Sequence, residues 1–221
     1  MKVLVMGDTH GNWGYLNKII EKKQPEVILQ TGDFGYWENF SEYQLSMIKN
    51  GDTKIYFCDG NHENHSLLKQ NGMIQEVAKN IYHCQRGSLL NLNNINILFV
   101  GGAESVDKRF RTAGFDWFPE ENITQREFNI IMNHSKEDVD VVISHTCPLE
   151  FKVMENDCKG GDSNRVVLSR VLEKYSPTLW YFGHWHLYTK GQYKNTTWTC
   201  LDRDCEIDNF EILKMEEQRE D

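Results

Sequence analysis

Side chains that bind divalent metal ions in proteins recur along this chain, and each closely follows a short apolar run. The runs at residues 3–6, 27–29, 55–57, 141–143 and 179–182 are rich in β-branched or aromatic residues. The side chains concerned are Asp8, His10, Asp33, Asn61, His62, His145, His184 and His186. Carboxylate, amide and imidazole groups are the oxygen and nitrogen ligands of divalent ions. The pattern therefore indicates metal chemistry.

Apolar runs of this kind, bounded by glycine and turn residues, predict buried strands. The carboxyl ends of strands in an open α/β sheet meet at one crevice, so five distant segments would deliver their ligands to one rim. Two aspartates, one asparagine and three or four imidazoles are enough for two closely spaced ions. One carboxylate must then bridge, and Asp33 is the natural candidate because it is the single ligand after Gly32.

Helical patterns lie between the predicted strands. Residues 15–20 place apolar side chains on one helical face, and capping boxes at Ser41-x-x-Gln44 and Thr124-x-x-Glu127 predict two helix starts. A further helix is expected to begin at Asp162 or Ser163 and to end before Pro177. We expect an α/β protein with a single domain over residues 1–213 and a charged tail over 214–221.

Two parts of the chain give weaker patterns. Residues 89–118 predict one strong strand followed by a long polar and aromatic loop. Residues 197–201 and 207–213 predict two late strands that form a hairpin.

The sequence resembles the calcineurin-like metallophosphoesterases, with small bacterial and phage-type members in particular. The motifs that carry the resemblance are, in order, Gly7-Asp8-Thr9-His10-Gly11, Gly32-Asp33, Gly60-Asn61-His62-Glu63, His145 and Gly183-His184-Trp185-His186. They extend from residue 8 to residue 186, which is most of the chain. The resemblance implies a four-layer αββα sandwich of two mixed sheets, with a dinuclear site at the carboxyl ends of the strands.

Residue by residue, the resemblance implies two sets of metal ligands. One ion would take Asp8, His10, Asp33 and His186, and the other would take Asp33, Asn61, His145 and His184. His62 would lie just outside the ions, as a proton donor to the leaving group or as a stabiliser of charge in the transition state. The family reaction is hydrolysis of phosphate mono- or diesters through attack by a metal-bridging hydroxide.

Charge arithmetic agrees with this expectation. Two divalent ions carry four positive charges, Asp8 and Asp33 return two negative ones, and a bridging hydroxide leaves a net charge of about +1 that still attracts phosphate. Mn²⁺ is the expected ion, although Fe, Zn, Ni and Co are compatible with the same ligands.

Substrate selection is expected to depend on a segment downstream of Gly101-Gly102. Protein Ser/Thr phosphatases of this superfamily carry an arginine after the second motif, in a GDxVDRG pattern, and this chain has Phe34-Gly35-Tyr36-Trp37 there instead. Arg109 and Arg111 are the candidates for bidentate phosphate contacts. The candidates for stacking on a nucleobase are Trp117, Tyr36 and Trp37. A small phosphorylated or nucleotide-like substrate is therefore expected.

Composition narrows the classes of partner. The net charge of −9 argues against a broad nucleic-acid-binding surface. The mean hydropathy of −0.60 and the absence of a long apolar run argue against membrane attachment. Six cysteines without a CxxC pair favour the reducing cytoplasm. The sequence leaves the oligomeric state open.

Three other readings stay open at this point. They are a Ser/Thr-type protein phosphatase, a phosphoesterase that processes nucleic-acid ends, and a non-catalytic metal-binding scaffold. The remaining histidines, His65, His83 and His134, are expected to be solvated because they do not directly follow a predicted strand.

Overall fold

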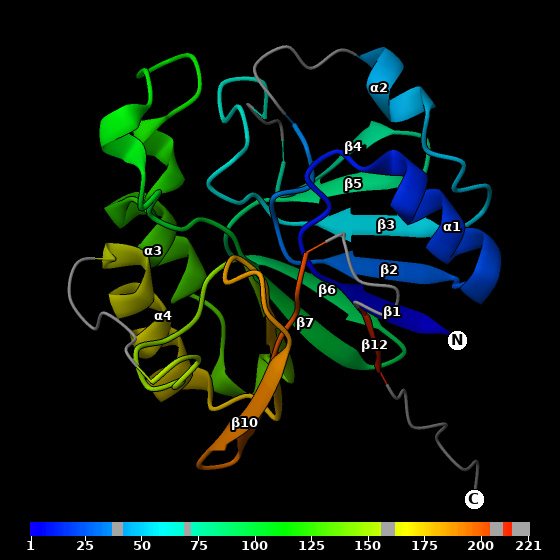
Figure 1. The fold of residues 1–221 in the computed structure, drawn as a ribbon. Helices are drawn as coiled ribbons and strands as arrows, with labels where there is room; N and C mark the ends of the chain where they lie inside the picture. Colours follow the sequence, from blue (N-terminus) through cyan, green and yellow to red (C-terminus); the bar gives the residue numbers. More distant parts are fainter. Residues whose placement is uncertain (37–41, 69–71, 156–161, 204–209, 214–221) are drawn as a thin grey trace, which may run out of the picture.

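A computed structural model describes residues 1–221 except for 37–41, 69–71, 156–161, 204–209 and 214–221. The described chain forms two six-stranded mixed sheets (Figure 1). The first sheet has the order β12 (Phe210–Leu213), β1 (Val3–Met6), β2 (Val27–Gln30), β3 (Lys54–Phe57), β5 (Ile81–Cys84) and β4 (Ile74–Ala78). The second has the order β10 (Thr189–Tyr193), β11 (Thr196–Cys200), β9 (Leu179–Phe182), β8 (Val141–Ser144), β7 (Ile95–Val100) and β6 (Ser88–Leu92).

Both sheets follow the same plan. The central strands β1, β2, β3 and β5 of the first sheet are parallel to one another, as are β7, β8, β9 and β11 of the second. The strand at each edge runs antiparallel to its neighbour. The carboxyl ends of the parallel strands therefore share one rim, which is the geometry that brings their loops together.

Apolar residues on both faces of each sheet create a layered core. In β1, Val3 and Val5 pack between the two sheets, whereas Leu4 and Met6 pack beneath α1 (Trp13–Lys23). In β8, Val141 and Ile143 face the inter-sheet core and Val142 faces the helices of the other side. Successive side chains of a strand point to opposite faces, so a strand that is buried on both faces is apolar throughout.

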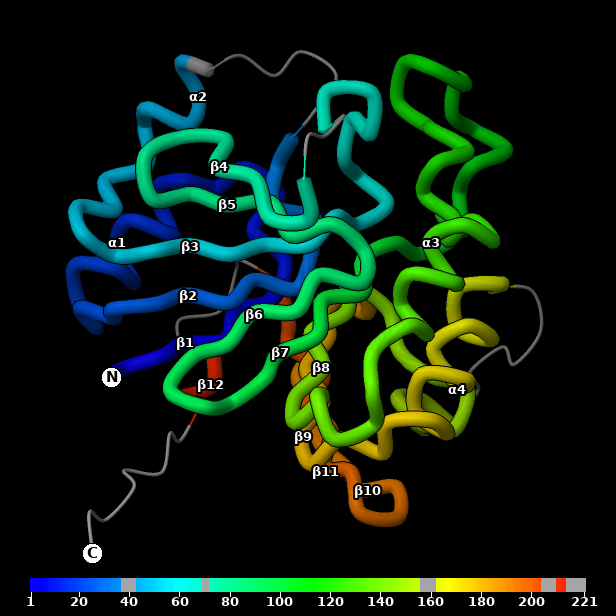
Figure 2. The backbone as a smooth tube through the Cα atoms, turned by 180° about the vertical axis from the view of Figure 1, so that it is seen from behind, coloured from blue at the N-terminus to red at the C-terminus, as the bar shows by residue number. Residues whose placement is uncertain are grey.

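Helices cover the two outer faces. Figures 1 and 2 show α1 and α2 (Glu42–Ser46) against the first sheet, and α3 (Gln125–Ile131) and α4 (Ser163–Tyr175) against the second. Short 3₁₀ helices lie at η1 (Lys108–Phe110), η2 (Pro119–Glu121) and η3 (Lys136–Asp138). The expected αββα sandwich is confirmed. Among the described residues, the structure contains no helix of the length and apolar character needed to cross a membrane.

Local helix signals agree with the structure. The Thr124 hydroxyl accepts from the Glu127 backbone N–H, and the Glu127 carboxylate accepts from the Thr124 backbone, which completes the predicted capping box. Asp162 caps α4 by accepting from the backbone N–H of Asn164 at 2.8 Å. The capping residue proposed at Ser41 lies outside the described residues.

Two predictions about the strands are wrong, one about their pairing and one about their number. The late strands do not form a hairpin, because β11 pairs with β9 and β10 in the second sheet, whereas β12 pairs with β1 in the first. The segment 89–118 contains the β6–β7 hairpin, not a single strand, before its loop begins. Strand patterns identify a segment as a strand but do not select its neighbour.

Candidate metal centre

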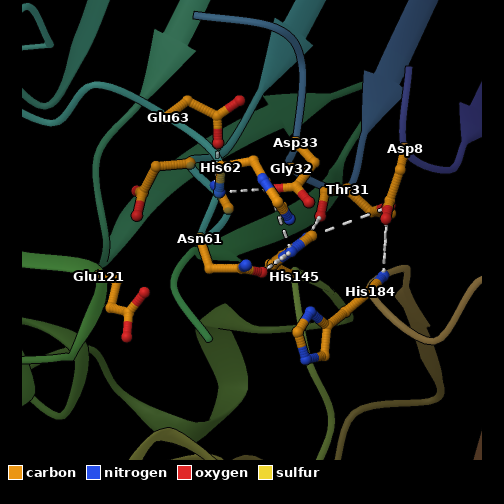
Figure 3. Close-up of polar contacts among 12 residues, drawn as sticks. Asp8, Thr31, Gly32, Asp33, Asn61, His62, Glu63, Glu121, His145 and His184 are labelled. Atoms are coloured by element: carbon orange, nitrogen blue, oxygen red, sulfur yellow. Dashed lines mark hydrogen bonds and ion pairs between the residues drawn. The ribbon is translucent and has the colours of Figure 1, made fainter. Parts of the chain in front are cut away.

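The residues expected to bind metal come together at the carboxyl ends of β1, β2, β3, β8 and β9 (Figure 3). Four of them have a left-handed backbone, with φ of 45° at His10, 51° at Asp33, 68° at His184 and 49° at His186. This conformation is uncommon for residues other than glycine and costs about 1 kcal/mol or more at each position. Such strain, repeated at the predicted ligands, is typical of a functional site.

One group of donors consists of Asp8, His10 and His186. His186 Nε2 lies 3.4 Å from Asp8 Oδ2 and 3.1 Å from His10 Nε2, and His10 Nε2 lies 3.8 Å from Asp8 Oδ2. The backbone N–H of His184 donates to both oxygens of Asp8, at 3.2 and 3.1 Å, and so fixes the orientation of this carboxylate.

A second group surrounds His145. Its Nε2 lies 3.3 Å from Asp33 Oδ1 and 3.0 Å from Asn61 Oδ1. Its Nδ1 donates to the carbonyl oxygen of Thr31 at 2.9 Å, an interaction that holds the ring with Nε2 toward Asp33 and Asn61. The His184 ring packs edge-on against the His145 ring, with centroids 5.0 Å apart.

Asp33 lies between the two groups. Its Oδ1 faces His145, whereas its Oδ2 lies 3.9 Å from His10 Nε2. Burial alone would raise the pKa of Asp33, but the neighbouring charges of His145, His62 and His10 hold it well below its usual value. The carboxylate therefore stays ionised between the two groups, as a bridging ligand requires.

The carboxylates and burial shift the pKa values of the two buried imidazoles in opposite directions. Burial would lower the pKa of His145, but Asp33 and Asp8 outweigh burial and raise it to about 10. Burial and the charge of His145 lower the pKa of His184 to about 3, which keeps that ring neutral. Buried carboxylates, an amide oxygen and ring nitrogens a few ångströms apart are a donor set suited to divalent cations. The residues present therefore fit metal ions.

Two glycines allow the ligand loops to pack this closely. A Cβ atom at Gly60 would collide with the side chain of Asp33, and one at Gly183 would collide with that of Asp8. The glycines of the GNHE and GHWH motifs are therefore explained by close approach of backbone to the ligand carboxylates.

His62 lies beside the candidate ligands. Its backbone N–H donates to Asp33 Oδ1 at 2.9 Å, and its Nε2 accepts from Arg111 Nη2 at 3.0 Å. The Nε of Arg111 lies 2.8 Å from Asp107 Oδ1. Burial, together with the cations of Arg111 and nearby histidines, lowers the pKa of His62 although Asp33 opposes the shift.

The other predicted substrate residues have different surroundings. The Arg109 guanidinium lies over the ring of Phe110, 4.6 Å from its centroid, on the same loop. Trp117 is half-buried, and Tyr36 belongs to the core beneath α1. Trp37 lies outside the described residues. The substrate roles of Arg109, Arg111 and Trp117 stay predictions.

The prediction of solvated histidines is wrong for two of the three. His65 and His83 have side chains less than a tenth exposed, and both face Asp59, with nitrogen-to-oxygen distances of 3.9 and 3.6 Å. His134 is half-buried and donates from Nε2 to the Gly87 carbonyl at 2.7 Å. Long-range packing around Asp59 decides their environment, and no local pattern reports it.

Arg86 and Asp59 form a buried ion pair behind the GNHE motif that was not predicted from the sequence. Arg86 Nη2 and Nε donate to Asp59 Oδ2 at 2.7 and 3.0 Å. Burial would raise the pKa of Asp59, but Arg86 and the bond from His83 keep it below its usual value. Arg86 also donates to the carbonyls of Glu120 and Asn122, each at 2.8 Å, and so anchors η2.

The Arg86→Met variant is expected to lower the free energy of unfolding by about 3–5 kcal/mol, because it leaves the Asp59 charge buried without its cation. Urea denaturation followed by circular dichroism measures the change. Arg170→Met is the matched control, since Arg170 forms an exposed pair with Glu173 and should change stability by about 0.5 kcal/mol or less. Equal losses in the two variants would contradict a structural role for the buried pair.

Three carboxyl- or hydroxyl-bearing residues near the ligands also gain roles from the structure. The buried Glu63 accepts from the backbone N–H groups of Gly60, at 2.5 Å, and Gly35, at 3.1 Å, which ties the loops after β2 and β3 together. The position of Glu63 in the GNHE motif was a signal for it. Ser105 and Glu121 contact Asn61 or one another, and no motif of the sequence indicated their connection.

Fold and site together define a class: a two-sheet αββα protein with a candidate metal centre at the carboxyl ends of its parallel strands. Comparison with known families agrees. The model of the calcineurin-like phosphoesterase family matches residues 1–188, and the chain belongs to this family.

Individual proteins that resemble this chain share a low sequence identity with it. The lariat debranching enzyme of Schizosaccharomyces pombe is 24% identical in an alignment 259 positions long. The alignment covers 98% of this chain and 56% of that enzyme. The chain thus spans little more than half the length of this curated relative. GAP50, the anchor in the inner membrane complex of Plasmodium, has a TM-score of 0.56 at 12% identity, over 93% of this chain and 72% of GAP50. Phosphopantetheinyl hydrolase PptH from Mycobacterium tuberculosis has a TM-score of 0.53 at 11% identity, over 98% of each chain. These two structures show a shared fold.

Proposed function

We propose that this protein is a dinuclear metal-dependent phosphoesterase that hydrolyses phosphate mono- or diesters of a small or nucleotide-like substrate. The observation that carries the proposal is the position of Asp33, whose two carboxylate oxygens face different groups of metal-binding side chains. The family is metal-dependent, which is consistent with this arrangement.

Two sets of residues would hold the ions. Asp8, His10, Asp33 and His186 would bind one ion, and Asp33, Asn61, His145 and His184 would bind the other. Bound divalent ions would supply Lewis-acid polarisation of the phosphate and lower the pKa of a water molecule between them. The chain itself orients these side chains. His145 donates to the Thr31 carbonyl, and the backbone N–H groups of His184 and His62 donate to Asp8 and Asp33.

His62 and Arg111 would act on the substrate. In the structure Arg111 donates to His62 Nε2, so this nitrogen is an acceptor. An anionic phosphate would draw the Arg111 guanidinium away from His62, because arginine binds phosphate with paired hydrogen bonds. His62 Nε2 would then be available to hold a proton for the leaving oxygen.

The direct test uses the protein loaded with Mn²⁺ and supplied with bis-p-nitrophenyl phosphate and p-nitrophenyl phosphate. We expect hydrolysis of at least one ester, and the ratio of the two rates will separate a diesterase from a monoesterase. If neither ester is hydrolysed while metal analysis shows two bound ions, the proposal is contradicted and a non-catalytic scaffold is favoured. Turnover of phosphopeptides with little action on nucleotides would favour a protein phosphatase.

A second candidate is a phosphodiesterase that acts on RNA. It is favoured by the similarity to the lariat debranching enzyme and by the exposed rings of Phe110 and Phe115 on the loop that also carries Arg109 and Arg111. Exposed aromatic and cationic side chains suit single-stranded nucleic acid, whose bases stack on aromatic rings. Cleavage of a lariat RNA at a higher kcat/KM than bis-p-nitrophenyl phosphate would support this candidate, and an uncleaved lariat RNA would exclude that substrate.

The Arg111→Met variant is expected to lower kcat/KM for the hydrolysed ester by about 10- to 100-fold, because it removes charged hydrogen bonds to the phosphate. Steady-state kinetics measures the loss. Arg126→Met, an exposed change on α3, is the matched control and should keep the parent value. An unchanged kcat/KM in Arg111→Met would remove Arg111 from the substrate site.

A further inference from the structure

We propose that Ser105 and Glu121 are positioning residues that hold the Asn61 side-chain amide with its oxygen toward the metal centre. The inference rests on the proposed dinuclear site and concerns the ion that Asn61 would bind. Ser105 contacts Asn61, and Glu121 contacts Ser105.

Two hydrogen bonds join the three residues in series, and a third joins Ser105 and Glu121 again. Asn61 Nδ2 donates to Ser105 Oγ at 3.1 Å, and Ser105 Oγ donates to Glu121 Oε2 at 2.5 Å. The backbone N–H of Ser105 also donates to Glu121 Oε1, at 3.0 Å, so both carboxylate oxygens are engaged by one residue. Figure 3 shows Asn61 between Glu121 and His145.

The series has a fixed direction. The Ser105 hydroxyl has a single proton and donates it to Glu121 Oε2, so it has no proton left for Asn61. Ser105 Oγ can then serve Asn61 only as an acceptor, and Asn61 must present its NH₂ group to it. The amide oxygen consequently faces the other way, where it lies 3.0 Å from His145 Nε2. That oxygen is the atom a metal ion would bind, because the NH₂ group of an amide has no ligand lone pair.

Burial of the three residues stabilises this arrangement of donors and acceptors. Glu121 is fully buried and Ser105 and Asn61 are 2% and 4% exposed, so water does not readily replace a lost partner. Arg86 fixes the backbone of the same turn by donating to the carbonyls of Glu120 and Glu121, at 2.8 and 3.2 Å. The carboxylate is therefore presented to Ser105 from an anchored position.

A glutamine at position 121 would keep the shape of the side chain but would no longer fix which group donates in each hydrogen bond. Its NH₂ group can donate to Ser105 Oγ, which then frees the hydroxyl to donate to Asn61 and lets the amide turn its NH₂ toward the ions. A residue that only supported the loop would tolerate this isosteric change at the metal site. The metal affinity of the two sites therefore separates a positioning role from a structural one.

The experiment is calorimetric titration of the metal-free full-length protein with Mn²⁺, together with metal analysis after dialysis at graded Mn²⁺ concentrations. We expect Glu121→Gln to lower the affinity for the Mn²⁺ that Asn61 would bind by about 10- to 100-fold, as the loss of an outer partner of a ligand commonly does. The affinity for the other Mn²⁺ should stay within about threefold of the parent value. Catalytic turnover should recover as Mn²⁺ is raised. Glu120→Gln is the matched control, with the same change of charge on the adjacent, exposed residue.

Ser105→Ala provides a second variant if Glu121→Gln does not fold, as judged by circular dichroism, and it should weaken the same ion by a similar factor. If a folded Glu121→Gln or Ser105→Ala protein binds both Mn²⁺ ions as tightly as the parent, this inference is overturned but the dinuclear site is not. A parent protein that binds a single Mn²⁺ would overturn the dinuclear site and this inference with it, so the two failures are distinct.

Discussion

The Asp33→Asn variant is expected to lower kcat for p-nitrophenyl ester hydrolysis by about 10³-fold, together with a loss of bound metal. Asp33 is buried and places one oxygen near His145 and the other near His10. Asparagine has nearly the same shape, but it is uncharged and turns an NH₂ group toward one of the two groups of ligands. The change therefore removes a negative charge and one of the two carboxylate oxygens that face these groups. Steady-state kinetics and metal analysis on the same preparation measure both effects.

Asp52→Asn is the matched control, since Asp52 is exposed and lies outside the centre. It should retain the parent activity and metal content. Retention of both properties in Asp33→Asn would contradict a bridging role and would leave the two groups of ligands without a common carboxylate.

The second large effect is expected for His62→Ala, which should lower kcat by about 10²- to 10⁴-fold and largely spare the metal content. His62 contacts Asp33 through its backbone N–H, and alanine preserves that bond. The imidazole faces Arg111, so its removal takes away the group that would handle the leaving-group proton. An ester with a p-nitrophenolate leaving group needs little protonation and should show a smaller loss than an alkyl phosphate ester. Comparison of the two substrates tests this role.

His134→Ala is the control for His62→Ala, because His134 is bound to the Gly87 carbonyl and lies outside the centre. A loss of metal from His62→Ala would instead assign His62 to the ligands. Equal losses on the two esters would favour stabilisation of charge in the transition state over proton donation.

Family membership alone does not choose among the functions considered for this protein. The same fold occurs in GAP50, an anchor, and in PptH, a hydrolase, at 11–12% identity to this chain. A fold hosts different functions, and the site decides between them. In this protein two groups of side chains could each hold a metal ion, and both contain the buried carboxylate of Asp8. This observation favours catalysis over a scaffold role.

The sequence by itself predicted the main strands and the candidate ligands. Each candidate ligand lies within four residues of a β-branched or aromatic run, and both signals are local, so spacing along the chain is sufficient to find them. The Thr124 capping box and the Asp162 cap are local in the same sense, because each bond joins residues two or three positions apart.

Tertiary structure alone decided the pairing of β12 with β1 and the surroundings of His65 and His83. It also decided which groups stand behind the ligands. Arg86 reaches Asp59 across 27 positions, and Asn61 reaches Ser105 across 44. Such contacts depend on how whole sheets and loops pack, and a single polar residue within a loop carries no periodic signal of its distant partner. The candidate metal ligands could therefore be predicted from the sequence, whereas the hydrogen bonds that orient their side chains were found only in the folded chain.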